Sequence, residues 1–227
     1  MSTWIRVARY QLTGRATYAG LWVGPALIFL LNLALAVTGV GARQGAGSFL
    51  IIISFNSLVT GALSITRQLP FALALGVSRR SFYAGTALLA GAIAAVYGLG
   101  VTVLELIERA TGGWGLNLHY FRVPHLLAGP WFLSWLTSFA GLALLLAWGM
   151  WFGIIYRRWD LRGLLAFIAA QALALLAVVV IIRWVHGWHG AGHFFTTLTT
   201  GGLTGLLAAL AVAMLAGGYA TIRRVTV

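Results

Sequence analysis

Apolar residues in this chain are gathered into long runs, which short polar or arginine-containing stretches separate. A helix needs about 20 consecutive apolar residues to cross the hydrocarbon core of a bilayer. The runs that approach this length predict six transmembrane helices: Leu21–Val40, Ser48–Ile65, Tyr83–Ile107, Trp131–Tyr156, Gly163–Ile182 and Thr200–Ala220. The chain is therefore expected to be an all-α integral membrane protein that forms a single domain over residues 1–227.

The first 18 residues precede an apolar run that is too long for a signal peptide and lacks a small-x-small cleavage site. At 100° per residue, four apolar side chains share one helical face, and two arginines and a threonine share the other. The apolar face holds Trp4, Ile5, Ala8 and Leu12, and the polar face holds Arg6, Arg9 and Thr13. Residues 1–18 thus predict an interfacial helix on the inner leaflet, and an unstructured basic tail is the alternative.

The arginines between the predicted spans are distributed unequally over the two sides of the membrane. One side holds eleven, namely Arg6, Arg9, Arg15, Arg67, Arg79, Arg80, Arg157, Arg158, Arg162, Arg223 and Arg224. The other side holds four, namely Arg43, Arg109, Arg122 and Arg183. Because cytoplasmic loops carry the excess of basic residues, both termini are expected in the cytoplasm of a multi-pass protein of the inner (plasma) membrane.

Composition narrows the possible functions further. Apolar residues make up 61% of the 227 residues and charged residues only 8%, against about 25% charged in soluble domains. The chain has no cysteine, which excludes disulfides and cysteine chemistry, and no lysine, which excludes a Walker A loop. Any ATP that drives this protein would be hydrolysed by another chain. The net charge of +12 lies in scattered loops, so membrane topology explains it better than nucleic-acid binding does.

The stretch 66–82, between the second and third spans, is too short and polar to cross a bilayer. Pro70 can open a short helix because the first helical amides have no partner, and Gly76 permits a left-handed stop. Ser78 can cap the next helix, which begins with Arg79 and Arg80. This pattern predicts a short amphipathic helix that docks a cytoplasmic partner, and an ordinary basic loop is the alternative.

The three acidic residues are Glu105, Glu108 and Asp160. Glu105 and Arg109 are four residues apart and can pair on one face of the third span, so we interpret them as a structural ion pair near the outer interface. A proton relay or an intramembrane hydrolase is the alternative, because ionisable groups at membrane depth are often functional. A hydrolase would also need histidines at matching depth, and the predicted spans contain none.

Other polar groups are candidates for metal or substrate binding. His186, His189 and His193 have a spacing that zinc could use, but glycines interrupt the segment, and we expect no metal there. Asn32, Asn56, Thr60 and Gln171 lie inside predicted spans and could contact a substrate or bond between helices.

Glycine pairs such as Gly149 and Gly153 would allow close approach of helices. Ser78 lacks the second glycine of a nucleophile elbow.

The segment from Leu73 to Thr86 is similar to the "LGxSRRxFxxG" stretch of type-two ATP-binding-cassette (ABC) exporter permeases. The interfacial first helix, the six spans with both ends inside, and the short helix between spans two and three also resemble that family. Members often carry a glutamate near this short helix, and this chain has none there.

The resemblance implies a dimer, formed with a second copy or a paralogue, in which each permease docks a separate ATPase subunit. The cofactors of such a transporter, ATP and magnesium, would bind to the ATPase. The coupling helix would consist of Leu69, Pro70, Phe71, Leu73, Leu75, Gly76, Ser78, Arg79 and Arg80. The chain would export a hydrophobic or amphipathic substrate by alternating access, past Asn32, Asn56, Thr60 and Gln171. A membrane subunit that senses or anchors a partner without transport is the second interpretation, and an intramembrane enzyme is the third.

Overall fold

The computed structural model describes residues 15–38, 45–117, 119–121, 130–185, 188, 190, 197 and 199–222. The described elements are α2 (Arg15–Val37), α3 (Gly45–Thr66), α4 (Gln68–Ala74), α5 (Arg79–Ala110), η1 (Gly113–Asn117), α6 (Trp131–Trp184) and α8 (Thr200–Ile222), with no strand among them. Among the described residues, four stretches are long and apolar enough to cross a membrane: Phe49–Ala74, Arg79–Ala110, Trp131–Trp184 and Thr200–Ile222. The all-helical class is confirmed and several helices suit a multi-pass membrane protein; six crossings and the orientation stay predictions.

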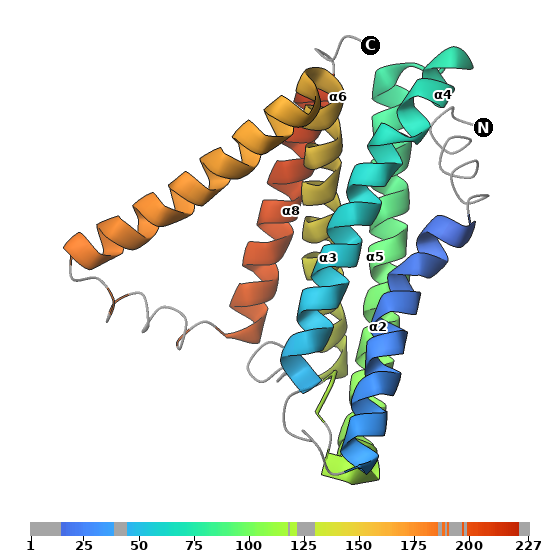
Figure 1. The fold of residues 1–227 in the computed structure, drawn as a ribbon, viewed down its shortest axis with the longest axis vertical. Helices are drawn as coiled ribbons and strands as arrows, with labels where there is room; N and C mark the ends of the chain where they lie inside the picture. The colour runs from blue at the N-terminus through green and yellow to red at the C-terminus, as the bar shows by residue number, and fades with distance from the viewer. Residues whose placement is uncertain are drawn as a thin grey trace.

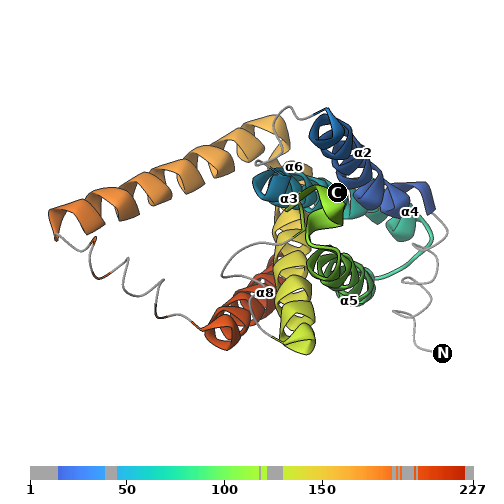
Figure 2. The same ribbon diagram turned by 90° about the horizontal axis from the view of Figure 1, so that it is seen from below.

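The helices form a bundle around the first part of α6. α3, α5 and α8 all pack against α6, and α2 packs against α3 (Figures 1 and 2). The short helix α4 lies at one end of the bundle and η1 at the opposite end (Figure 1), and we name these the α4 end and the η1 end. Residues 1–14, which hold most of the predicted interfacial helix, lie outside the described residues.

α6 is interrupted at Asp160, so it consists of two helical arms. Asp160 has φ 52° and ψ −155°, which is not a helical conformation. The first arm, 131–159, lies in the bundle, while the second arm, 161–184, leans away from it (Figure 1). The sequence predicts a loop between Tyr156 and Gly163; the chain instead reverses at a single residue and stays helical on both sides of it.

Glycines bring α3 and the first arm of α6 into backbone contact. A Cβ atom on Gly149 would collide with the carbonyl oxygen of Leu58, and a Cβ atom on Gly153 would lie 2.8 Å from that of Ala62. The close approach predicted at Gly149 and Gly153 is therefore confirmed. A Cβ atom on Gly201 or Gly205 would have no described heavy atom within 4 Å, so these glycines support no such contact in the described structure.

Two apolar clusters hold the bundle together, one toward each end. The α4-end cluster joins α3, α4, α5, α6 and α8 through buried side chains of Ile65, Leu69, Ala72, Phe82, Tyr83, Ala147, Met150, Ile154 and Ile222. The η1-end cluster consists of Phe49, Ile53, Leu89, Ile93, Ala94, Val101, Tyr120, Phe121, Leu142 and Leu146. The α4-end cluster thus connects α4 with the end of α8 and with the first arm of α6.

Candidate functional site

The short helix α4 forms between α3 and α5 because local signals both start and stop it. Pro70 lies in its first turn, where a missing N–H breaks few helical bonds. At its other end, Gly76 has φ +75°, and its N–H donates to the carbonyl of Leu73 at 3.0 Å. The N–H of Val77 donates to the carbonyl of Ala72 at 3.0 Å. These two bonds form a Schellman motif, which ends α4 as the sequence predicts.

The chain restarts as α5 immediately after this stop. Ser78 has extended backbone angles, and its Oγ accepts a hydrogen bond from the backbone N–H of Ser81 at 3.2 Å. The N-cap predicted at Ser78 is therefore confirmed. Together, the Schellman motif and the cap fix the direction of α4 relative to α5.

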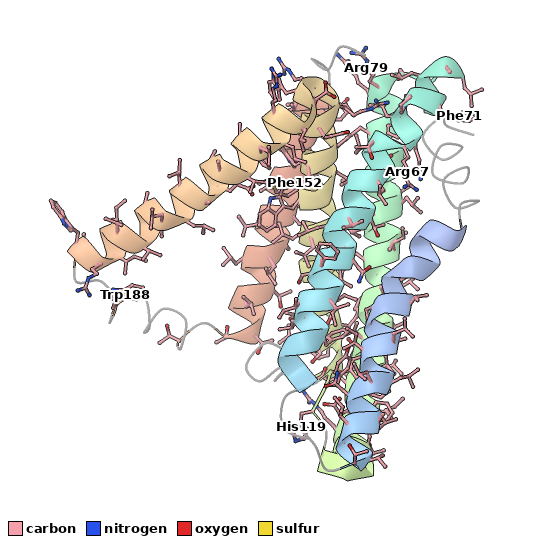
Figure 3. The ribbon with its side chains drawn as sticks, in the orientation of Figure 1. Arg67, Phe71, Arg79, His119, Phe152 and Trp188 are labelled. Carbon is pink, nitrogen blue, oxygen red and sulfur yellow. The ribbon has the colours of Figure 1, made fainter. Side chains whose placement is uncertain are left out.

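α4 has one buried face and one exposed face. Leu69 and Ala72 are buried in the α4-end cluster, which attaches the helix to the bundle. Phe71 is 49% exposed and Leu75 is 64% exposed, although both are large apolar side chains. Arg67, the residue just before α4, is exposed and lies on the same side of the bundle as Phe71 (Figure 3). A guanidinium group therefore lies near the apolar surface.

Arg79 and Arg80 occupy the first two positions of α5, where positive charge is unfavourable. The N-terminus of a helix carries a partial positive charge, so each cation there costs roughly 0.3–1 kcal/mol. No acidic residue occupies this first turn to offset the cost. Arg80 is exposed and Arg79 is half-buried. The start of α5 is therefore a positively charged surface.

The η1 end is organised around a buried carboxylate that the sequence analysis did not assign. Glu108 is 1% exposed, and its Oε2 accepts hydrogen bonds from the backbone N–H groups of Tyr120 (3.0 Å) and Phe121 (2.8 Å). The indole Nε1–H of Trp114 donates to the same oxygen at 3.2 Å. Glu108 thus holds the chain that follows η1 against the end of α5. The ion pair predicted between Glu105 and Arg109 is also present, one turn earlier.

The aromatic residues held by Glu108 are buried between helices. The hydroxyl of Tyr120 donates to the carbonyl of Pro25 in α2 at 3.0 Å. Burial raises the pKa of Tyr120 to about 12, so this phenol keeps its proton at neutral pH. Phe29 packs its ring on Tyr120 at 5.3 Å and on Phe121 at 5.4 Å between ring centroids. Tertiary contacts thus place Tyr120 and Phe121 inside the bundle.

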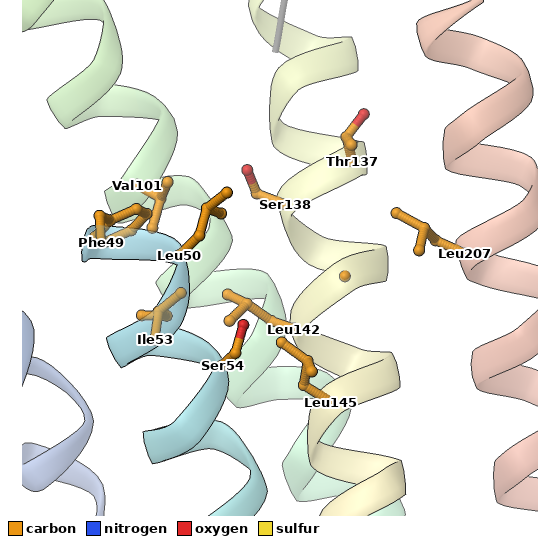
Figure 4. A pocket seen from close by; sticks show the side chains of 11 residues that line it. Phe49, Leu50, Ile53, Ser54, Val101, Thr137, Ser138, Leu142, Leu145 and Leu207 are labelled. Atoms are coloured by element: carbon orange, nitrogen blue, oxygen red, sulfur yellow. The ribbon is translucent and has the colours of Figure 1, made fainter. Parts of the chain in front are cut away.

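A cavity of about 130 Å³ lies among α3, α5, α6 and α8 (Figure 4). Its walls are mostly apolar, with the hydroxyl-bearing Ser54, Thr137 and Ser138 among them; the other lining residues are Phe49, Leu50, Ile53, Val101, Gly141, Leu142, Leu145 and Leu207. A cavity of this size holds one small apolar group, about as large as benzene. None of the four residues predicted to contact substrate lines it.

The structure places these four residues on α2, on α3 and on the second arm of α6. The side-chain amide of Asn32 bonds to the carbonyl of Ile28 in its own helix at 2.8 Å. Asn56 bonds to its own helix in the same way, at 3.0 Å. Thr60 is buried and lines a small gap that contains none of the other three, and Gln171 lies on the second arm of α6. A substrate path that they share between two subunits stays a prediction.

The described residues contain no group of three side chains that could hold a metal ion. The Nδ1 atom of His119 is 3.9 Å from the Oε1 atom of Glu108, and its side chain is 47% exposed. His119 lies at the η1 end, far from α4 (Figure 3). His186, His189 and His193 lie outside the described residues.

No protein-family model matches this sequence, and the comparisons with characterised proteins and with solved structures return no significant match. The function must therefore be argued from the chemistry of the chain itself.

Proposed function

We propose that this chain is the membrane subunit of an ATP-driven exporter and that α4 couples it to a separate ATPase subunit. The ATPase would bind the exposed face of α4, with Arg79 and Arg80 beside it. ATP and magnesium would bind to that partner, because this chain has no lysine for a Walker A loop. The exporter would lie in the inner (plasma) membrane with α4 on the cytoplasmic side.

The exposure of Phe71 and Leu75 is the observation that carries this proposal. Both are large apolar side chains on a helix whose other face is buried and whose end is fixed. A rigid helix that presents two apolar anchors, with the exposed Arg67 at its start, suits insertion into a groove on a partner. Because α4 contacts α3 and α5, and Leu69 and Ala72 lie in a cluster that also includes α6 and α8, movement of α4 would be transmitted to the membrane helices.

A membrane subunit that binds a partner without transport is the second candidate, since the same exposed face would serve it. The two functions differ in the partner that binds α4. A transporter requires a partner that hydrolyses ATP and whose rate of hydrolysis depends on this chain. A sensor or anchor requires neither property.

The test is affinity purification of the chain from its own membranes in mild detergent, with ATP hydrolysis and bound partners as readouts. We expect an ATPase to co-purify with the wild type. The double variant Phe71→Ala/Leu75→Ala should reduce its retention by roughly 30-fold, since hot-spot side chains contribute 2 kcal/mol or more. Leu161→Ala is the matched control, because Leu161 is exposed near the break in α6 but lies outside α4.

A second variant tests the two arginines at the start of α5. Arg79→Glu/Arg80→Glu should also release the ATPase if the arginines face an acidic groove. Full retention by both double variants would disprove docking through α4. A partner without ATPase activity would favour the second candidate.

A further inference from the structure

The angle between the two arms of α6 encloses a groove that the proposed coupling does not use. The groove has a volume of about 630 Å³ and is lined by Ile155, Trp159, Arg162, Gly163, Ala166 and Phe167. Its volume lies in the range of roughly 300–1,000 Å³ that is typical of small-molecule sites. Its walls are apolar, and its apex is the polar turn at Asp160.

The second arm of α6 needs something to cover it. None of the residues 161–184 is buried, although this arm is one of the most apolar parts of the chain. Within the chain, the ring of Phe167 packs on that of Phe152 in the first arm, with 5.3 Å between ring centroids. The groove beyond this contact is apolar on both sides and suits hydrocarbon.

The apex of the groove is strongly basic. It carries Arg157, Arg158 and Arg162 against the single acid Asp160, a formal net charge of +2. Among the described residues, no ion pair joins Asp160 to these arginines. The Nε atom of Arg157 is buried and has no hydrogen-bond partner among the described residues. The guanidinium groups of Arg158 and Arg162 are exposed, and both are therefore available to an anion.

The turn also holds one guanidinium in position. Arg158 stacks its guanidinium on the ring of Trp159, 4.4 Å from the ring centroid. A Cβ atom on Gly163 would collide with the Cβ atom of Trp159, and the ring carbon Cγ would lie only 3.1 Å away, so Trp159 is packed closely against Gly163. Tryptophan prefers the headgroup layer of a bilayer, so this stack places Arg158 at the depth of lipid phosphates.

We propose that this groove binds an anionic glycerophospholipid, with its phosphate on Arg158 and Arg162 and its acyl chains along Ala166 and Phe167. Guanidinium groups bind phosphate through paired charge-assisted hydrogen bonds, and basic pockets between membrane helices are suited to anionic headgroups. A second copy of this chain is a poorer occupant, because two apices would bring six arginines together. The site does not depend on ATP-driven transport.

Native mass spectrometry of the full chain in detergent tests the site. The probes are phosphatidylglycerol and phosphatidylcholine with identical acyl chains. We expect the wild type to retain phosphatidylglycerol preferentially. Arg158→Gln/Arg162→Gln should weaken this retention roughly 30-fold, because each arginine near an anionic lipid surface contributes about fivefold. Arg79→Gln/Arg80→Gln removes the same charge at the same end of the bundle and should leave it unchanged.

A second pair of variants keeps every charge and fills the groove. Ala166→Trp should displace the acyl chains and reduce retention of phosphatidylglycerol, whereas Leu165→Trp, on an exposed position outside the groove lining, should not. These two tryptophan variants test whether the groove holds the lipid even if the double arginine variant fails to fold.

Three results would overturn the proposal. Equal losses in the two double arginine variants would show attraction by general surface charge. Unchanged retention in Ala166→Trp would show that the groove does not hold the lipid. A dimer that excludes phosphatidylglycerol would assign the groove to a second copy.

Discussion

The two ends of the bundle differ in whether their polar and apolar groups find partners within the chain. At the η1 end, the polar groups of a connecting segment are satisfied internally, because the carboxylate of Glu108 accepts three N–H donors. At the α4 end, large apolar side chains and arginines remain at the surface of a helix that is itself held firmly. The contacts at the η1 end therefore stabilise the fold, whereas the α4 end leaves apolar and basic side chains uncovered.

The largest expected effect tests the η1 end. Glu108→Ala leaves three buried donors without their acceptor, and each unsatisfied donor costs roughly 1–3 kcal/mol. We therefore expect the free energy of unfolding to fall by about 3 kcal/mol or more, measured by chemical unfolding in detergent. Glu108→Gln retains an acceptor oxygen and should lose clearly less. Equal losses in the two variants would contradict the role of the hydrogen bonds.

The next effect concerns the stop of α4. Gly76 has φ +75°, and a residue with a Cβ atom pays roughly 1–2 kcal/mol in the left-handed region. Gly76→Ala should therefore destabilise α4 locally and increase hydrogen exchange of its amides, while the η1 end keeps its protection. As a control, Gly141→Ala adds a Cβ atom in helical backbone with no described atom within 4 Å. Uniform loss of protection across the bundle would show that the two ends are not independent.

A smaller effect is expected at the hydroxyl of Tyr120. Tyr120→Phe keeps the buried ring and removes only the donor to Pro25, which is typically worth about 1 kcal/mol. We expect this loss of unfolding free energy in the single variant and almost none when Glu108→Ala is already present. Full additivity of the two substitutions would contradict a common network at the η1 end.

The smallest effect on stability belongs to the exposed face of α4. Phe71→Ala and Leu75→Ala remove side chains that are largely exposed, so the free energy of unfolding should change by no more than about 0.5 kcal/mol. The same substitutions should remove the partner. A large loss of stability without loss of the partner would assign these side chains to the fold rather than to docking.

The sequence predicts helix ends and ion pairs within a helix correctly, because these features depend on only a few neighbouring residues. Ser78 caps α5, and Gly76 ends α4, since capping bonds and backbone angles depend on immediate neighbours. The pairing of Glu105 with Arg109 follows in the same way from a spacing of four residues on one helix. Glu108 was named only as a candidate for a proton relay or hydrolase. Its structural role was not predicted, because its donors come from segments 6 to 13 residues further along the chain and no spacing rule connects them.

The predicted substrate residues show the same limit. Asn32, Asn56, Thr60 and Gln171 were grouped by their depth within the spans. Depth says nothing about the direction in which a side chain points. In the structure the two asparagines bond to their own helices, and Gln171 lies on an arm that leaves the bundle.

The sequence alone determined the helical segments of this chain and the ends of α4, because length, hydropathy and capping are properties of contiguous residues. It also excluded a Walker A loop within these 227 residues, because the sequence has no lysine. The sequence predicts a loop between Tyr156 and Gly163, but only the tertiary structure showed that the chain reverses at the single residue Asp160, which is neither glycine nor proline. The tertiary structure also decided which apolar faces are covered and which remain exposed, because burial depends on contacts between residues far apart in the chain.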